Sequence, residues 1–156
     1  MLTVVRNTPS CLIPKELFKE ETIQEYWNVL FPNSYNESIG CDNFEDSFLL
    51  YPKPQNTESI HEVSLMYKNI REQFFDKSEA ICLNVDENIC NLMILKDLNI
   101  LFMGHFNFSV NEDIVYRLVN FSQHFFENIS NITFFYRQLP PTTPSFLKKY
   151  FTMIQI

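Results

Sequence analysis

The chain has 156 residues, of which 46% are hydrophobic and 15% aromatic, and its formal net charge is −7. This length and apolar content are enough for a packed core and exclude an intrinsically disordered chain. The acidic balance, the scattered Lys and Arg residues and the lack of an apolar run of about 18 residues argue against nucleic-acid and membrane binding.

The first third of the chain predicts two short strands, a helix and a loop. Apolar runs indicate strands at residues 2–6 and 10–13. Pro14 favours the first position of a helix, so we expect a helical stretch, with a break, that reaches residue 30 or 31. The polar residues 33–46 indicate a loop.

A strand and a helix are expected next. The apolar residues 48–51 predict the strand, and Ser59 is expected to cap a helix whose apolar face includes Ile60, Val63 and Ile70. No strand meander precedes these elements. The first half therefore looks like a partial, shortened copy of the second half.

The second half opens with three strands separated by tight turns. Apolar and β-branched residues fill 80–85, 89–96 and 100–108, and polar clusters at 86–88 and 97–99 end the first two runs. The short turns predict an antiparallel meander. Apolar residues occupy both the odd and the even positions of these strands, which face opposite sides of the sheet. We therefore expect both faces of the sheet to be covered.

A long helix and two crossover connections complete the second half. Asn111 is a favourable N-cap, and the spacing of apolar residues predicts a helix over 111–128 that buries Leu118 and Phe125. The remaining predicted elements are a strand at 132–136, a helix beginning at Pro144 and a strand at 153–156.

This order of elements, βββαβαβ, predicts an α/β protein with a mixed sheet of the ribonuclease-H-like type. The same arrangement is the repeating half of the actin, sugar-kinase and Hsp70 fold. We therefore expect residues 1–78 to form an incomplete first actin-like lobe and residues 79–156 to form a ribonuclease-H-like second lobe.

Glycine is scarce, which bears on phosphate binding. The sequence has only Gly40 and Gly104, where average usage would give about eleven. Loops that cradle phosphate usually need glycine so that the backbone can approach closely. The composition therefore argues against an intact nucleotide site.

The turn Asp86-Glu87-Asn88 occupies the place of an Asp-x-Gly phosphate-binding turn in actin-like folds. Asp86 could organise a metal ion and Asn88 could contact phosphate, but no glycine follows and Glu87 would repel an anion. Asp and Asn are common turn formers, so a structural β-turn is the simpler interpretation.

The segment after the fourth strand of the second half offers a further anion-binding candidate, Arg137. The prolines that follow remove amide donors from the place where adenosine binds in actin-like folds. A nuclease would need several converging carboxylates, for which Asp86 could be joined by Glu112 or Asp113. These two carboxylates are also favoured at a helix start by the helix dipole.

Histidine and cysteine indicate no catalytic or metal site. His61, His105 and His124 stand on different elements, and a partly buried structural histidine is commoner than a catalytic one. Cys11, Cys41, Cys82 and Cys90 lack zinc-ligand spacing, so we expect Cys82 and Cys90 to be buried reduced thiols.

Several stretches resemble a Bacteroidetes domain-of-unknown-function family whose members adopt an actin-like ATPase fold. The similar stretches are residues 12–21, 92–97, 100–102, 111–116 and 146–151. The resemblance implies a two-lobed actin-like fold and no particular activity. Family members begin with an additional strand unit, so the resemblance also implies that the first lobe is incomplete here.

These observations favour a non-catalytic scaffold or interaction domain in the bacterial cytoplasm, with no cofactor and with degenerate nucleotide-binding loops. The alternative is a divergent ATP-binding protein or ATPase that holds ATP and magnesium with Asp86, Asn88 and Arg137. A protein partner or a homodimer is expected at the open sheet edge of residues 2–5, beside an apolar patch that includes residues 48–51.

Overall fold

The computed structural model describes residues 2–6, 8–33, 38–73, 79–129 and 132–156. It contains two compact units, Met1–Lys68 and Asn69–Ile156. The division falls inside helix α2 (Glu62–Gln73), whereas the predicted boundary at 78/79 lies beyond this helix. None of the described helices is long and apolar enough to cross a membrane.

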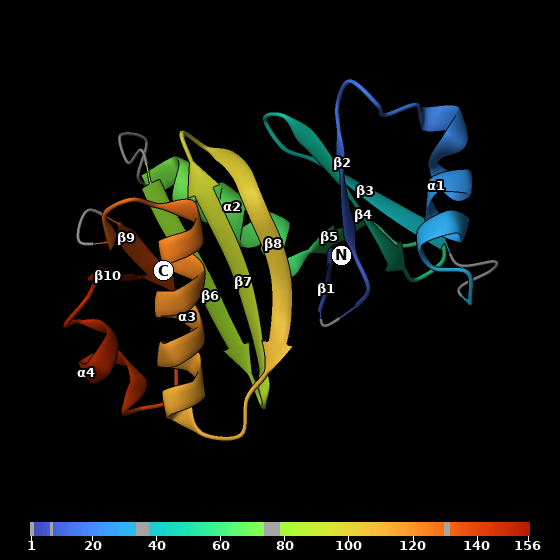
Figure 1. Cartoon of the computed structure of the whole chain (residues 1–156). Helices are drawn as coiled ribbons and strands as arrows, with labels where there is room; N and C mark the ends of the chain where they lie inside the picture. The colour runs from blue at the N-terminus through green and yellow to red at the C-terminus, as the bar shows by residue number, and fades with distance from the viewer. Residues whose placement is uncertain (1, 7, 34–37, 74–78, 130–131) are drawn as a thin grey trace. The chain divides into compact units, whose positions relative to one another are not determined.

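The first unit contains two small sheets, the helix α1, a short 3-10 helix η1 and the first part of α2 (Figure 1). In one sheet, β1 (Thr3–Val5) and β5 (Ser59–His61) pair in parallel. In the other, the antiparallel order is β2-β4-β3. The remaining bounds are β2 (Cys11–Pro14), η1 (Glu20–Thr22), α1 (Ile23–Leu30), β3 (Ser38–Asn43) and β4 (Ser47–Lys53).

Trp27 of α1 lies at the centre of a small core in this unit. Its side chain is fully buried and belongs to the same cluster as Ile13 of β2 and Leu50 of β4. Phe18 extends the cluster and stacks on Phe48, with ring centroids 3.9 Å apart. The apolar positions of α1 therefore account for its packing against the three-stranded sheet.

Several predictions for the first half are wrong. Residues 38–43 form strand β3 rather than a loop, and Pro14 ends β2 instead of opening a helix. Ser59 begins β5, so it does not cap α2, which starts at Glu62. The expected apolar surface patch at residues 48–51 is also wrong, because the last three of these side chains are fully buried.

The second unit contains a five-stranded mixed sheet in the order β10-β9-β6-β7-β8. The β6–β7 and β7–β8 pairs are antiparallel, while β6–β9 and β9–β10 are parallel. This topology confirms the predicted βββαβαβ arrangement. The strands are β6 (Glu79–Asp86), β7 (Ile89–Lys96), β8 (Asn99–Asn107), β9 (Thr133–Tyr136) and β10 (Thr152–Gln155).

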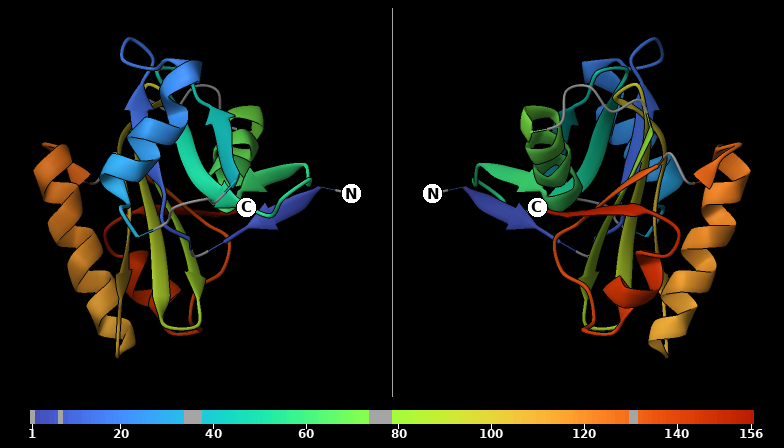
Figure 2. Two further views of the ribbon diagram at one scale, coloured as in Figure 1. Left: turned by 90° about the vertical axis from the view of Figure 1, so that its right-hand side faces the viewer. Right: turned by 90° about the vertical axis from the view of Figure 1, so that its left-hand side faces the viewer.

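Helix α3 (Asn111–Phe125) lies along one face of this sheet (Figures 1 and 2). Its Ile114 and Leu118 are fully buried in one cluster with strand residues such as Phe134. Phe125 is only half-buried, contrary to prediction, and the neighbouring Phe126 is buried instead. The second crossover contains the short helix α4 (Thr143–Leu147).

The four cysteines are free thiols. Cys82 and Cys90 are buried in β6 and β7, as predicted, and burial raises the pKa of both. Burial also raises the pKa of Cys11 and of Cys41 to about 11, although the Cys41 side chain is exposed. All four thiols are therefore almost entirely protonated at neutral pH.

The β7–β8 turn places two residues in the left-handed region. Asp97 has φ 50° and Leu98 has φ 65°. Two positive φ values in a two-residue hairpin turn are favoured by Asn-Gly or Asp-Gly, and a leucine with this backbone conformation is strained.

Leu98→Gly is expected to leave the second unit about 1 kcal/mol more stable than Leu98→Ala does, because both changes remove the side chain and only glycine relieves the left-handed strain. Urea denaturation followed by far-UV circular dichroism measures the difference. Equal stabilities of the two variants would contradict a strained turn.

Candidate functional site

The predicted site residues Asp86 and Arg137 lie at the same end of the five-stranded sheet. Asp86 is the last residue of β6, and Arg137 directly follows β9, which runs parallel to β6. The Arg137 N–H donates to the Leu83 carbonyl at 3.2 Å, so the segment after β9 stays against β6. Asn88 stands in the adjoining β6–β7 turn.

This end of the sheet lacks the features of a phosphate-binding turn. Glu87 occupies the left-handed position of the turn, with φ 51°, and its side chain is exposed. The Asn88 carbonyl accepts the Phe108 N–H at 3.1 Å, which ties the turn to the end of β8. Asp86 is half-buried, and Arg137 is exposed. The local geometry is that of a hairpin turn that carries two carboxylates, those of Asp86 and Glu87, and no glycine.

The carboxylate of Asp113 caps helix α3. It accepts the backbone N–H groups of Ser109 and Val110 at 3.1 and 3.4 Å. Asn111, the predicted N-cap, is instead the first helical residue, and its amide donates to the Thr142 hydroxyl at 3.0 Å. The structure therefore gives Asp113 a capping role, which is separate from the metal ligation expected in a nuclease.

Both glycines of the chain lie in strands, and each packs against an aromatic ring. Gly40 of β3 is paired with Tyr51 of β4, and an ideal Cβ on Gly40 would lie 2.5 Å from the Tyr51 ring. An ideal Cβ on Gly104 of β8 would lie 2.8 Å from Cζ of Phe102. Neither glycine has a positive φ. Their positions are explained by ring packing, without a ligand.

The first unit contains a partly buried polar cluster that no local sequence pattern predicts. The Tyr51 hydroxyl donates to one oxygen of the Asp42 carboxylate at 3.0 Å and lies 2.9 Å from the Ser59 carbonyl. The other Asp42 oxygen accepts the His61 N–H at 2.9 Å. Burial, followed by the Asp42 charge, raises the pKa of Tyr51.

His61 is a neutral member of this cluster. Its side chain is only 3% exposed, and burial lowers its pKa to about 4, although the Asp42 charge acts in the opposite direction. Nδ1 accepts the Val63 N–H at 3.3 Å, so the proton resides on Nε2, which is buried and has no hydrogen-bond partner within the described part of the chain. By contrast, His105 and His124 are exposed.

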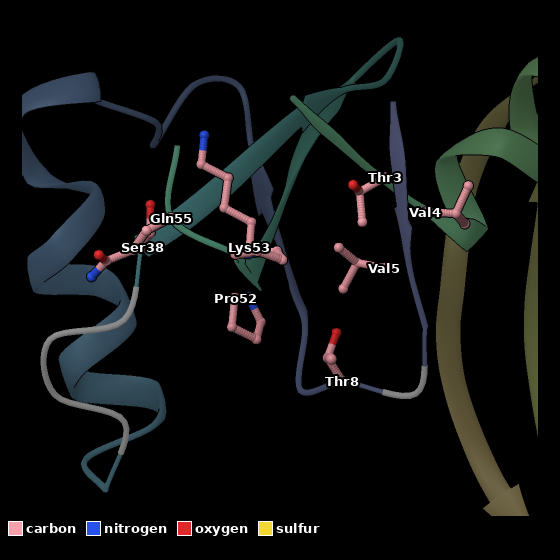
Figure 3. Close-up of a pocket in the computed structure, with 9 residues that line it drawn as sticks. Thr3, Val4, Val5, Thr8, Ser38, Pro52, Lys53 and Gln55 are labelled. Atoms are coloured by element: carbon pink, nitrogen blue, oxygen red, sulfur yellow. The ribbon is translucent and has the colours of Figure 1, made fainter. Parts of the chain in front are cut away.

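A cavity of about 570 Å³ lies beside β1 in the first unit (Figure 3). Thr3 and Val5 point from β1 toward Pro52 and Lys53, whereas Val4 points to the opposite side of the strand. Thr8 also lines the cavity, and its buried hydroxyl oxygen has no hydrogen-bond partner among the described residues. The sequence contains no motif that predicts this cavity, because its walls come from segments far apart in the chain.

Comparison with known proteins places the chain in a family. The sequence profile described as "Protein of unknown function (DUF3822)" matches residues 2–128. The chain belongs to this family. No curated protein matches the chain.

Solved structures show how the family member folds. A Bacteroides thetaiotaomicron VPI-5482 protein, described as having an actin-like ATPase fold and unknown function, superposes with a TM-score of 0.78 at 13% identity. The match covers 99% of this chain and 67% of that protein. A chain of a PilM-PilN type IV pilus biogenesis complex gives a TM-score of 0.56 at 9% identity, over 99% and 68% of the two chains. The predicted actin-like fold is therefore confirmed.

Proposed function

We propose that this family member is a non-catalytic scaffold or interaction domain of the bacterial cytoplasm, built on an actin-like fold with degenerate nucleotide-binding loops. The use of glycine carries this proposal. The only two glycines in the sequence, Gly40 and Gly104, are both in strands under aromatic rings. None remains for the close backbone approach that a phosphate-binding turn requires.

The β6–β7 turn supports the same proposal. Glu87 adds a negative charge at the position where a phosphate would approach the turn. The similar chain in the pilus biogenesis complex is part of a protein assembly. An actin-like fold is thus compatible with a role in which the fold presents binding surfaces.

The second candidate function is a divergent ATP-binding protein or ATPase. The observation that favours it is the parallel pairing of β6 and β9, which brings Asp86 and the segment of Arg137 to one end of the sheet. In this reading, Asp86 holds magnesium, while Asn88 and Arg137 contact the phosphates of ATP.

A thermal denaturation series with millimolar ATP and magnesium separates the two functions. We expect no change in Tm. If ATP did bind, a concentration of 100 times its Kd would add about 2.7 kcal/mol to the free energy of unfolding and would raise the Tm measurably. The matched variants are Asp86→Asn, at the last residue of β6, and Asp97→Asn, in the β7–β8 turn of the same sheet. Stabilisation by ATP that is lost only in Asp86→Asn would establish the ATP-binding function and overturn the scaffold proposal.

A further inference from the structure

We propose that the outer edge of β1 binds an extended, acidic peptide segment of a partner protein as an added β-strand. The segment would place an apolar side chain in the cavity beside Val5 and a carboxylate near Lys53. This inference rests on the proposed interaction function and identifies the surface and the chemistry of the partner.

Within the described part of the chain, the backbone of β1 is paired on one side only. β1 pairs with β5 in the register Thr3↔Ser59, and the Thr3 N–H donates to the Glu58 carbonyl at 3.0 Å. Because the two backbone groups of a strand residue point to the same side and alternate along the strand, those of Val4 point away from β5. Among the described residues, no backbone group pairs with Val4.

The opposite edge of this small sheet is closed by side chains. On β5, the outward N–H of His61 is bound by the Asp42 carboxylate. The outward carbonyl of Ser59 lies 2.9 Å from the Tyr51 hydroxyl, which can donate to it. A new strand can therefore extend the two-stranded sheet at β1, where main-chain groups are available, in the manner of β-strand addition.

The cavity lies on the face of β1 that carries the side chains of Thr3 and Val5, and an added strand would continue this face of the sheet. Thr3 and Val5 line it on one side, and Pro52 and Lys53 line it on the other (Figure 3). Alternate side chains of an added strand would be on this face, next to Val5. A volume of about 570 Å³ accommodates such side chains. Unpaired main-chain groups and a cavity for alternate side chains together provide affinity and specificity.

Lys53 selects an acidic partner over a second copy of this chain. It is a half-buried cation at the cavity, in a protein with a net charge of −7. Residues 2–6, which would pair across a β1–β1 dimer, contain no Asp or Glu. The paired residues of a second β1 would therefore supply no carboxylate to Lys53, whereas an acidic peptide supplies one and is attracted by the cation.

The test uses a phage-displayed library of random dodecapeptides, selected on the full chain and counter-selected on the Val4→Pro variant. Proline at position 4 removes an outward-facing N–H and leaves the β1–β5 hydrogen bonds intact. We expect enrichment of sequences with β-branched or aromatic residues and an Asp or Glu. The corresponding synthetic peptides, labelled with fluorescein, are then titrated by fluorescence anisotropy.

Binding of these peptides is expected to weaken at least tenfold in Val4→Pro and, separately, in Lys53→Glu. The exposed Lys19 lies elsewhere in the same unit, so Lys19→Glu is the matched charge control and should bind like the native chain. The fluorescence of Trp27, the only tryptophan, verifies that each variant is folded. If Val4→Pro does not fold, Lys53→Glu still tests the site.

Failure to enrich any peptide, or equal binding by Lys53→Glu and the native chain, would overturn the proposed site. A dimer seen by light scattering and abolished in Val4→Pro would assign the edge to a second copy and would also overturn it. Neither result affects the scaffold proposal, which depends on the nucleotide titration. Conversely, ATP binding would overturn the scaffold proposal even if peptides bind at β1.

Discussion

Gly40→Ala is expected to lower the free energy of unfolding of the first unit by about 2–4 kcal/mol. An ideal Cβ at this position would lie 2.5 Å from two ring atoms of Tyr51. The Tyr51 side chain is fully buried, and its hydroxyl lies within hydrogen-bonding distance of Asp42 and Ser59. The ring therefore cannot move away without losing these contacts, and overpacking of this kind is strongly destabilising.

Denaturant titration followed by Trp27 fluorescence measures this loss, because Trp27 is buried in the same unit. In a Tyr51→Phe background the ring has no hydroxyl to hold it, so Gly40→Ala should be less destabilising there. A loss below about 1 kcal/mol in the native background would contradict the packing role assigned to Gly40.

Gly104→Ala is the natural comparison. Its Cβ would meet Cζ of Phe102 at 2.8 Å, but Phe102 is only half-buried and its ring carries no hydrogen bond that would prevent it from tilting. A smaller loss is therefore expected, measured by circular dichroism of the second unit. A larger loss than at Gly40 would show that burial and hydrogen bonding of the ring do not control the outcome.

His61 is expected to make the first unit less stable as the pH falls. Its pKa is about 4 in the folded chain, compared with an ordinary value of 6.5. Between these two values the unfolded chain binds more protons than the folded chain, so stability rises with pH in this range. The contribution is fully present above pH 6.5 and is lost as the pH falls toward 4. The shift corresponds to about 3 kcal/mol.

The variant His61→Asn isolates this effect. Asparagine keeps an acceptor for the Val63 N–H and cannot be protonated, so the difference in unfolding free energy between pH 7 and pH 4.5 should shrink by about 2–3 kcal/mol. Trp27 fluorescence during urea unfolding at each pH provides the measurement. His124→Asn, at an exposed histidine, should keep the native pH dependence. An unchanged slope in His61→Asn would show that His61 is not the titrating group.

The sheet of the second half could be predicted because its strands are bounded by local signals. The polar clusters at residues 86–88 and 97–99 end two strands with apolar residues on both faces, and the structure places hairpin turns at both. The end of α3 was harder to predict. The spacing of apolar residues predicts a helix up to residue 128, whereas the helix ends at Phe125. The backbone of the next residue, Phe126, is extended.

Long-range contacts explain the failures in the first half. Strand β3 contains Gly40, Asp42 and Asn43, which have low strand propensity, and its pairing with β4 holds it extended. After Pro14, the Lys15 N–H bonds the carbonyl of Asp46, which is 31 residues away in sequence, and this contact replaces the expected helix start. Tertiary context overrides local preference at both places.

The polar cluster of the first unit could not be read from the sequence for the same reason. Asp42 and the His61 N–H are 19 residues apart, and Asp42 stands in a stretch whose composition is typical of a loop. The positions of Asp86, Asn88 and Arg137 in the fold could be predicted more accurately, because each of them lies at or next to the end of a predicted strand. Asp86, Asn88 and Arg137 remain predictions as nucleotide ligands.

The protonated state of the four native thiols has a practical consequence for spectroscopy. Cys82 and Cys90 are buried and burial raises the pKa of both thiols, so they react slowly with maleimides at neutral pH, whereas the exposed Cys41 is accessible to the reagent. A single cysteine introduced on an exposed loop can therefore be labelled selectively with a fluorophore or spin label in a Cys41→Ser background. Cys82 and Cys90 can stay in place, so the packing of β6 and β7 around them is preserved.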